Sequence, residues 1–285
     1  MINLFLNERL KINFKIQFRE NKLGYISLCI ILILVLSSTF SFLSPYDPNK
    51  IDLSNKLANP SLKHLFGTDE MGRDYFTRSL YGGRASLMVG FISMIISTTL
   101  GTIVGTFSGY IGGKIDNIIM RTIDILMCIP TFFLILIINA YLEPGIENII
   151  IIIGLFGWMD IARIVRAQTL SLKEREYVLC SKALGAPNKK IIFKHIIPNV
   201  IPSVMVASTI NIASAILTES SLSFLGLGVR APNSSWGSML QNAQGFISSS
   251  PYLAIFPGLF ILFTVLSFNI LGDIFAIALD PKINK

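Results

Sequence analysis

Few residues in this chain have the types and spacing that covalent chemistry requires. The histidines are His64 and His195, and the cysteines are Cys29, Cys128 and Cys180. Two histidines are too few for an all-histidine metal site, and the dispersed cysteines form neither a CxxC site nor a disulfide framework. We interpret the cysteines as small apolar fillers. The sequence also lacks GxxxxGK[ST], HExxH and GxSxG motifs, so it predicts no catalytic site, no metal site and no cofactor or nucleotide bound by this chain itself.

A group of charges in residues 45–85 is the next candidate for chemistry. Asp69, Arg73 and Asp74 lie close together in this mixed-charge segment. Such a group can serve a catalytic centre or a network of ion pairs. We interpret it as a solvated ion-pair cluster of a loop.

The long polar stretch of residues 170–202 has residue types suited to recognition of a partner. Residues 170–184 contain no Gly or Pro and are mostly helix formers, which predicts one helix. Gly185 predicts a left-handed end to that helix, and Pro187 suits the first turn of the next one. The second helix is expected to gather its apolar residues on one face, namely Ile192, Phe193, Ile196 and Ile197. Basic residues accompany the stretch: Arg163, Arg166, Lys173, Arg175, Lys182, Lys189, Lys190 and Lys194.

From charge alone, this stretch could be a basic cytoplasmic loop with no further role, since such loops are common in membrane proteins. The order of its residues favours a docking element. It resembles the EAA loop of the membrane subunits of binding-protein-dependent ABC importers, in which Glu-Ala-Ala is followed by a Gly and then a Pro. The corresponding residues here are Leu179-Cys180-Ser181, Gly185 and Pro198. The missing Glu removes one possible charge contact with a partner, while Cys and Ser keep that helix face shallow.

The resemblance implies that this loop docks on a partner ATPase and couples it to the membrane helices. The residues expected to form that coupling loop are Tyr177, Val178, Ser181, Lys182, Ala183, Leu184, Gly185, Ala186 and Pro198.

Other segments resemble the dipeptide and oligopeptide branch of the same family. Residues 64–87 are similar to the loop after the first span of those permeases, and residues 220–237 are similar to a later outer loop. Near the end of the chain, Asn269, Gly272, Asp273, Asp280 and Pro281 also match, although residues 275–277 depart from the family's more polar pattern. The resemblance extends from about His64 to Pro281.

The composition indicates that the helices holding these loops lie in a membrane. The chain has 285 residues, of which 52% are hydrophobic and 14% charged, whereas soluble domains carry about 25% charged residues. Apolar runs of about 20 residues can span a bilayer. They predict an all-α polytopic protein with six transmembrane helices, near residues 23–43, 86–109, 117–140, 146–165, 200–219 and 253–277. The first run is too long for a signal peptide, and we interpret it as an uncleaved span.

The distribution of basic residues predicts that both termini are cytoplasmic. The net charge of +7 is explained by anionic lipid and this rule rather than by nucleic acid. We expect a first region, residues 1–85, holding the cytoplasmic N-terminus, the first span and an outer loop. Residues 86–277 are expected to form the ABC importer type I transmembrane domain, with its coupling loop near residues 166–199. Residues 278–285 are then a cytoplasmic tail.

Three local features predict how the helices pack. Small residues recur every four positions in the second span (Ser93, Ser97, Gly101, Gly105 and Gly109), which indicates a close helix–helix seam. In the third span, Arg121 and Asp124 are three residues apart and are expected to pair. Pro130 is expected to kink that span.

The resemblance therefore implies a permease subunit of a bacterial inner-membrane ABC importer of dipeptides or oligopeptides, which is not itself an enzyme. It also implies a second homologous permease subunit, two cytoplasmic ABC ATPases that bind the ATP, and an extracytoplasmic peptide-binding protein. Two alternatives remain open. A nickel permease of the same superfamily would share these motifs. A stand-alone secondary carrier or channel would instead show inverted repeats or several intramembrane charges, and neither is evident.

Overall fold

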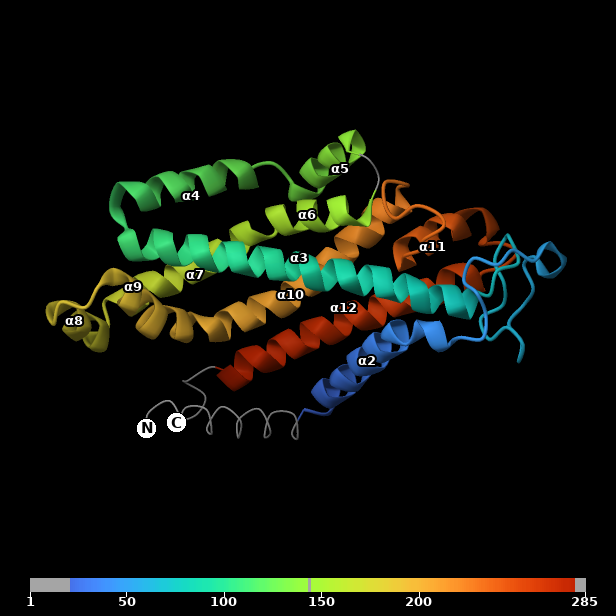
Figure 1. Ribbon diagram of the computed structural model, residues 1–285, viewed down its shortest axis with the longest axis horizontal. Coiled ribbons are helices and arrows are strands. Elements are labelled where there is room, and N and C mark those ends of the chain that lie inside the picture. Colours follow the sequence, from blue (N-terminus) through green and yellow to red (C-terminus); the bar gives the residue numbers. More distant parts are fainter. Residues whose placement is uncertain (1–20, 143–144, 280–285) are drawn as a thin grey trace.

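The computed structural model describes residues 21–142 and 145–279 as an elongated bundle of helices (Figure 1). In the described residues the extended pairing consists of one isolated bridge, between Thr68 and Asp74. The predicted basic head of the chain and its last residues, including Asp280 and Pro281, lie outside the described residues. The helices are α2 (Lys22–Thr39), α3 (Tyr75–Ile111), α4 (Gly113–Met127), α5 (Thr131–Tyr141), α6 (Ile146–Phe156), α7 (Trp158–Lys173), α8 (Glu176–Ala183), α9 (Asn188–Ile191), α10 (Ile197–Phe224), α11 (Trp236–Ala243) and α12 (Tyr252–Leu279).

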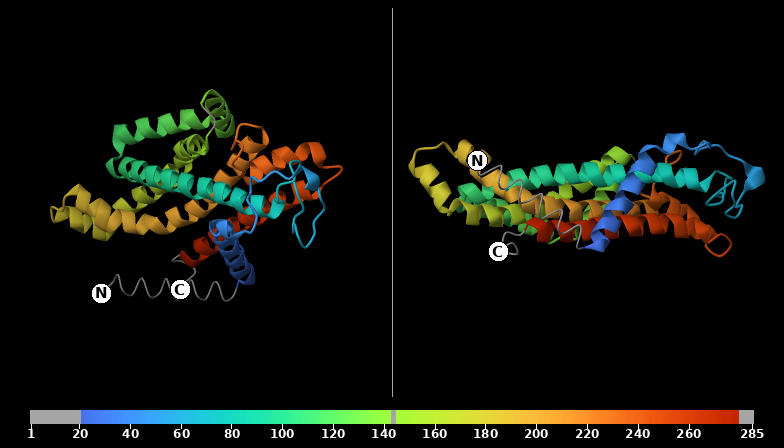
Figure 2. Two further views of the ribbon diagram at one scale, coloured as in Figure 1. Left: turned by 45° about the vertical axis from the view of Figure 1, so that its right-hand side comes forward. Right: turned by 90° about the horizontal axis from the view of Figure 1, so that it is seen from below.

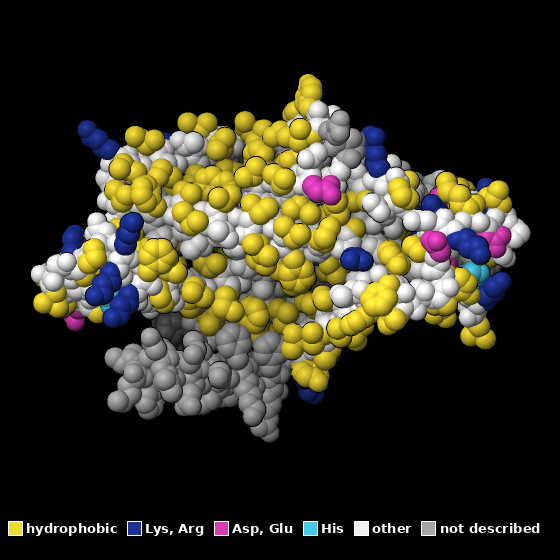
Figure 3. Space-filling model, viewed as in Figure 1, with side chains coloured by type: hydrophobic (Ala, Val, Ile, Leu, Met, Phe, Trp, Pro, Cys, Tyr) yellow, Lys and Arg dark blue, Asp and Glu magenta, His cyan; other side chains and the backbone are white. Residues whose placement is uncertain are grey.

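The long helices confirm the prediction of an all-helical membrane protein. Among the described residues, five helical stretches are long and apolar enough to cross a membrane, and a bent pair of helices makes a sixth. Helices α3, α10 and α12 run along the long axis, with α8 and α9 at one end of the bundle and α11 at the other (Figure 1). Hydrophobic side chains cover the middle of the visible face, and charged side chains gather at the two ends, with Lys and Arg near the α8–α9 end and both signs of charge at the opposite end (Figure 3). This distribution is the one a bilayer requires.

Helix α3 begins at Tyr75, well before the predicted start near residue 86. The cause is an N-cap: the Asp74 side chain accepts a hydrogen bond from the Thr77 backbone N–H at 2.8 Å, which satisfies one of the free donors at the helix start. The helix is 37 residues long, longer than a bilayer requires, so its first turns extend into the polar end of the molecule.

The expected kink at Pro130 is a break. Helices α4 and α5 meet at 77° across the segment from Cys128 to Pro130, because proline cannot continue the hydrogen-bond ladder of a helix. Helix α4 lies along the outside of the bundle, and α5 turns away from it (Figure 2).

The stripe of small residues on α3 is a packing seam, as predicted. Ser93 and Ser97 donate hydrogen bonds to the backbone carbonyls of Ile150 and Gly154, both at 3.0 Å. Further along, a methyl group added at Gly105 would lie 2.5 Å from the Ala162 carbonyl oxygen. The absence of side chains here lets the backbones of α3 and α7 approach closely, as in other membrane helix pairs.

The predicted pairing of Arg121 with Asp124 is wrong. Asp124 lies 3.5 Å from the guanidinium of Arg163 on α7. Helix α7 runs beside α4, so Asp124 pairs with Arg163 of the neighbouring helix and not with Arg121 of its own helix.

Candidate functional site

The polar stretch after α7 folds as a compact tip, residues 174–196, between two long helices. The predicted single helix over residues 170–184 is wrong, because α7 ends at Lys173 and α8 begins at Glu176. Arg175 between them is extended, with φ −72° and ψ 142°. The Lys173 ammonium donates to the Gly109 carbonyl at 3.1 Å, which ties the end of α7 to the end of α3. The break turns α8 so that Val178, 2% exposed, reaches a core cluster with residues of α7 and α10.

Gly185 ends α8 in the left-handed conformation that its sequence position predicts. Its φ is +79°. The Gly185 N–H donates to the Lys182 carbonyl at 3.0 Å, and the Ala186 N–H donates to the Ser181 carbonyl at 3.1 Å. This pair of bonds is the Schellman motif. Pro187 lies one residue earlier than expected, at the N-cap of α9 rather than in its first turn.

The residues after α9 form a π-helical turn, Ile192–Ile196, which leads into α10. Its wider turn places residues five apart on one face, so Ile191 and Ile196 are both fully buried. The predicted apolar face is therefore wrong in part. Phe193 is 70% exposed, and Ile192 and Ile197 are half-buried.

The structure places most of the predicted coupling residues on the surface of the tip. Val178 is buried, Ser181 and Ala186 are half-buried, and Tyr177, Lys182, Ala183, Leu184, Gly185 and Pro198 are exposed. The Tyr177 ring lies beside the His195 ring, with centroids 5.9 Å apart. Leu179 and Phe193, which were not among the predicted coupling residues, are also exposed. Their signal was a large apolar side chain in a polar, basic stretch. Cys128 and Cys180 are exposed, so their interpretation as fillers is wrong.

The tip thus presents apolar side chains with basic residues around them. Leu184 is 87% exposed and Phe193 is 70% exposed, and Tyr177 and Leu179 are each 45% exposed. The exposed lysines Lys182, Lys189, Lys190 and Lys194 lie among them. A surface with anchoring apolar groups and a charged rim is typical of a protein–protein contact.

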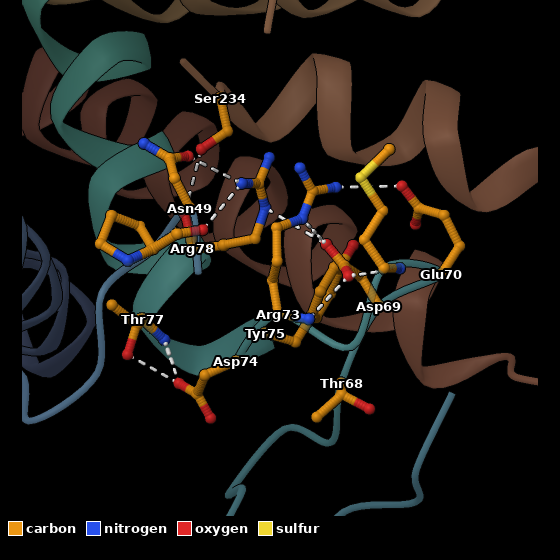
Figure 4. Close-up of polar contacts among 12 residues, drawn as sticks. Asn49, Thr68, Asp69, Glu70, Arg73, Asp74, Tyr75, Thr77, Arg78 and Ser234 are labelled. Carbon is orange, nitrogen blue, oxygen red and sulfur yellow. Dashed lines mark hydrogen bonds and ion pairs between the residues drawn. The ribbon is translucent and has the colours of Figure 1, made fainter. Parts of the chain in front are cut away.

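The other end of the bundle carries a lobe, residues 40–74, whose charges form a buried network (Figure 4). Arg73 Nε donates to Asp69 Oδ2 at 2.6 Å and Arg73 Nη2 donates to Glu70 Oε1 at 3.0 Å, while Arg78 Nε lies 3.4 Å from Asp69. Asp74 contacts His64 Nδ1 at 2.8 Å. The expectation of a solvated cluster is wrong, since Asp69 is only 2% exposed. All its members are paired, which fits a structural network.

Tyrosines and short turns hold the lobe against the helices. The Tyr75 hydroxyl donates to the Leu253 carbonyl at 2.6 Å, and the Tyr252 hydroxyl lies 3.1 Å from the carbonyls of Ala58 and Thr68. Within the lobe, a hydrogen bond from the Ser54 side chain lowers the pKa of the Asp52 carboxyl. These hydrogen bonds make the lobe an ordered part of the fold.

Glu219 near the end of α10 is a polar residue that the sequence analysis did not single out. It is fully buried. Its carboxyl group accepts from the hydroxyls of Ser223 at 2.6 Å and Ser86 at 3.0 Å. The Ser86 contact joins α10 to α3. An acidic residue inside an otherwise apolar run was the available signal.

Two further features of the described residues bear on metal and ligand binding. They include no cluster of three or more His, Cys, Asp or Glu side chains that could bind a metal. A cavity of about 410 Å³ lies between α7, α10 and α12, with Gln168, Ser203 and Ile210 in its lining. The described residues thus form long helices with an exposed apolar and basic tip at one end and a polar lobe at the other.

Comparison with known proteins identifies the class. Residues 101–285 match the family described as "binding-protein-dependent transport system inner membrane component", and residues 13–60 match the N-terminal transmembrane domain of oligopeptide transport permease C. The chain belongs to this family of membrane permease subunits, and it is a multi-span helical membrane protein.

Particular relatives cover nearly the whole chain. It is 41% identical to the oligopeptide transport system permease protein OppC of Bacillus subtilis, over 95% of this chain and 89% of that protein. It is 42% identical to OppC of Haemophilus influenzae (94% and 87%) and 40% identical to the glutathione transport system permease protein GsiD of Escherichia coli (94% and 89%).

The fold is also found in a solved transporter. The chain resembles an inward-facing structure of the MetNI methionine ABC transporter with a TM-score of 0.59 and 20% identity, over 72% of this chain and 97% of that one. The predictions of the permease family and of an ABC importer fold are confirmed. A stand-alone carrier or channel has no such support.

Proposed function

We propose that this chain is one of two non-identical membrane subunits of an ABC importer of small peptides. The observation that carries the proposal is the 41% identity to an oligopeptide permease over 95% of the chain. The permease relatives transport dipeptides, oligopeptides and glutathione according to their names, so the shared substrate chemistry is a short peptide. Two cytoplasmic ATPases bind and hydrolyse the ATP, and an extracytoplasmic protein delivers the peptide.

The tip of residues 174–196, with Pro198 beside it, is the proposed docking surface for one ATPase. Its exposed apolar residues Leu184 and Phe193 fill a groove on the partner, and the lysines around them contact acidic residues at the rim of the groove. The buried side chain of Val178 packs α8 against α7 and α10. Since the tip connects α7 directly to α10, a shift of the docked ATPase moves both spans. Only a difference in contact between the two nucleotide states can drive that shift.

Uptake of a labelled peptide tests the function. Deletion of the coding region is expected to abolish uptake of a labelled tripeptide, and the wild-type chain should restore it. The permease chains reconstituted without ATPases should hydrolyse no ATP. Loss of nickel uptake with unchanged peptide uptake would contradict the peptide assignment and favour the nickel permease.

Thiol labelling tests the orientation, in which both termini and the tip are cytoplasmic. Asn233, shortly before α11, and Glu147, in the first turn of α6, are exposed, and Cys180 is a natural exposed thiol on the tip. In single-cysteine chains, Asn233→Cys and Glu147→Cys are expected to react with an impermeant maleimide in intact cells. Cys180 is expected to react in inverted vesicles alone. The reverse pattern would invert the topology.

A further inference from the structure

We propose that the ion pair between Asp116 and Arg166 transmits movement of α7 to the bent segment α4–α5. The inference rests on the proposed function, since it takes α7 as the helix that the docked ATPase displaces. Asp116 lies in the first turn of α4, and Arg166 lies on α7 before its end at Lys173. The pair therefore joins a helix leading into the tip to a helix that has no direct connection with the tip.

The pair has the geometry of a strong, specific contact. Arg166 Nε and Nη2 donate to Asp116 Oδ1 and Oδ2 at 2.5 and 2.6 Å. The Asp116 side chain is 7% exposed, and the Ser108 hydroxyl also donates to it. Bidentate, charge-assisted hydrogen bonds of this kind fix the relative orientation of the two side chains and also stabilise their contact. The Arg166 side chain is 30% exposed, so removing Arg166 leaves the buried Asp116 carboxylate without its counter-charge.

Helix α4 needs such a tie because its connection to α3 is a pivot. Gly112 and Gly113 join the two helices, with φ of +71° and +62°. A methyl group at Gly113 would meet nothing within 4 Å, and one at Gly112 would lie 3.4 Å from Nζ of Lys173, so packing against this turn is sparse. Two consecutive glycines with positive φ give the backbone room to rotate.

The other contacts of α4 with α7 are apolar or exposed. Ile123 is fully buried against Met159 and Ala162 of α7, and further apolar residues of α4 pack on this cluster, namely Ile119, Met120, Leu126 and Met127. The second ion pair, Arg163 with Asp124, is 3.5 Å long with half-exposed side chains, and exposed pairs contribute little. Outward-facing residues such as Ile118 and Ile125 are exposed. Near the pivot, Asp116 and Arg166 thus form the short, directional polar contact between α4 and α7.

A natural reporter lies at the far end of α4. Cys128 is exposed and stands in the 77° break before α5. In a chain with Cys29→Ser and Cys180→Ser, Cys128 carries a bimane fluorophore, and the chain is reconstituted with its second permease and ATPases in vesicles. Incubation with ATP and vanadate, which traps the ATPases with ADP and vanadate bound, is expected to change the emission of the wild-type sample.

Asp116→Arg and Arg166→Asp, each alone, are expected to reduce that change about fivefold or more, the lower end of coupling between sites. The ATPases should still co-purify as they do with the parent Cys29→Ser, Cys180→Ser chain, because Asp116 and Arg166 lie outside the tip. The exchange Asp116→Arg with Arg166→Asp should restore most of the change. Asp124→Asn, which removes the exposed pair, is the matched control and should leave it intact. If a charge-reversed chain fails to assemble, Asp116→Asn is measured in the same assay, and it too is expected to reduce the emission change.

The outcomes separate the inference from the proposed function. An unchanged signal in the single variants or in Asp116→Asn, or no recovery in the exchange, overturns the inference while the importer assignment stands. A wild-type complex that assembles but shows no emission change also overturns it. Failure of the wild-type chain to co-purify with the ATPases contradicts the proposed function itself, and the inference with it.

Discussion

Gly185→Val is expected to abolish most peptide uptake while the chain remains inserted in the membrane. Gly185 has a φ of +79° and closes the Schellman motif at the end of α8. A β-branched residue is a steric outlier in that region, with a strain of about 1–3 kcal/mol. A methyl group there would meet nothing within 4 Å, so the strain comes from the backbone alone and is relieved by tilting α8 against α9. Because the apolar spans are untouched, insertion should be normal.

The decisive measurements are peptide uptake and co-purification of the ATPases. Gly185→Asn is the matched control, since Asn tolerates the left-handed conformation better than other side chains, and it should keep most of the uptake. Gly245→Val, at a glycine that also has open space and no positive φ, should have little effect. Normal uptake and co-purification in Gly185→Val would show that this turn is only a connector and not part of a docking surface.

Gly105→Leu is expected to prevent α3 from packing on α7 and thereby to destabilise the isolated chain. The first added carbon would lie 2.5 Å from the Ala162 carbonyl oxygen and 2.9 Å from the Val165 Cβ. A backbone oxygen cannot rotate away as a side chain can, so the two helices must separate. Overpacking costs about 1–3 kcal/mol and sometimes more. In lipid the loss matters especially, because van der Waals packing is the main attraction between spans.

The measurement is the thermal transition of the purified chain in detergent, without partners. Gly258→Leu is the matched control, since Gly258 lies in α12 and an added carbon meets nothing within 4 Å. Its transition should stay close to that of the wild-type chain. A transition for Gly105→Leu as high as for Gly258→Leu would mean that the seam is not as close as the structure places it.

Features that depend on neighbouring residues in the chain could be predicted from the sequence. Apolar runs determine the spans, because a bilayer selects for local hydrophobicity and length. The left-handed Gly185 follows from a glycine between two helix-forming stretches, since few other residues adopt that conformation. The break at Pro130 and the seam around Gly105 are also local patterns, of a missing donor and of small residues every four positions. The family itself was evident from the order of such residues.

Only the tertiary structure decided which residues meet across helices. Asp124 pairs with Arg163 rather than Arg121, and Asp116 meets Arg166 fifty positions away, because partner choice depends on how each helix is rotated and placed. The π-helical turn exposes Phe193 for the same reason: Ile191 and Ile196 both reach the core only if the turn is widened. The depth of Asp69 and of Glu219 likewise depends on distant segments that close over them, and no local pattern contains that information.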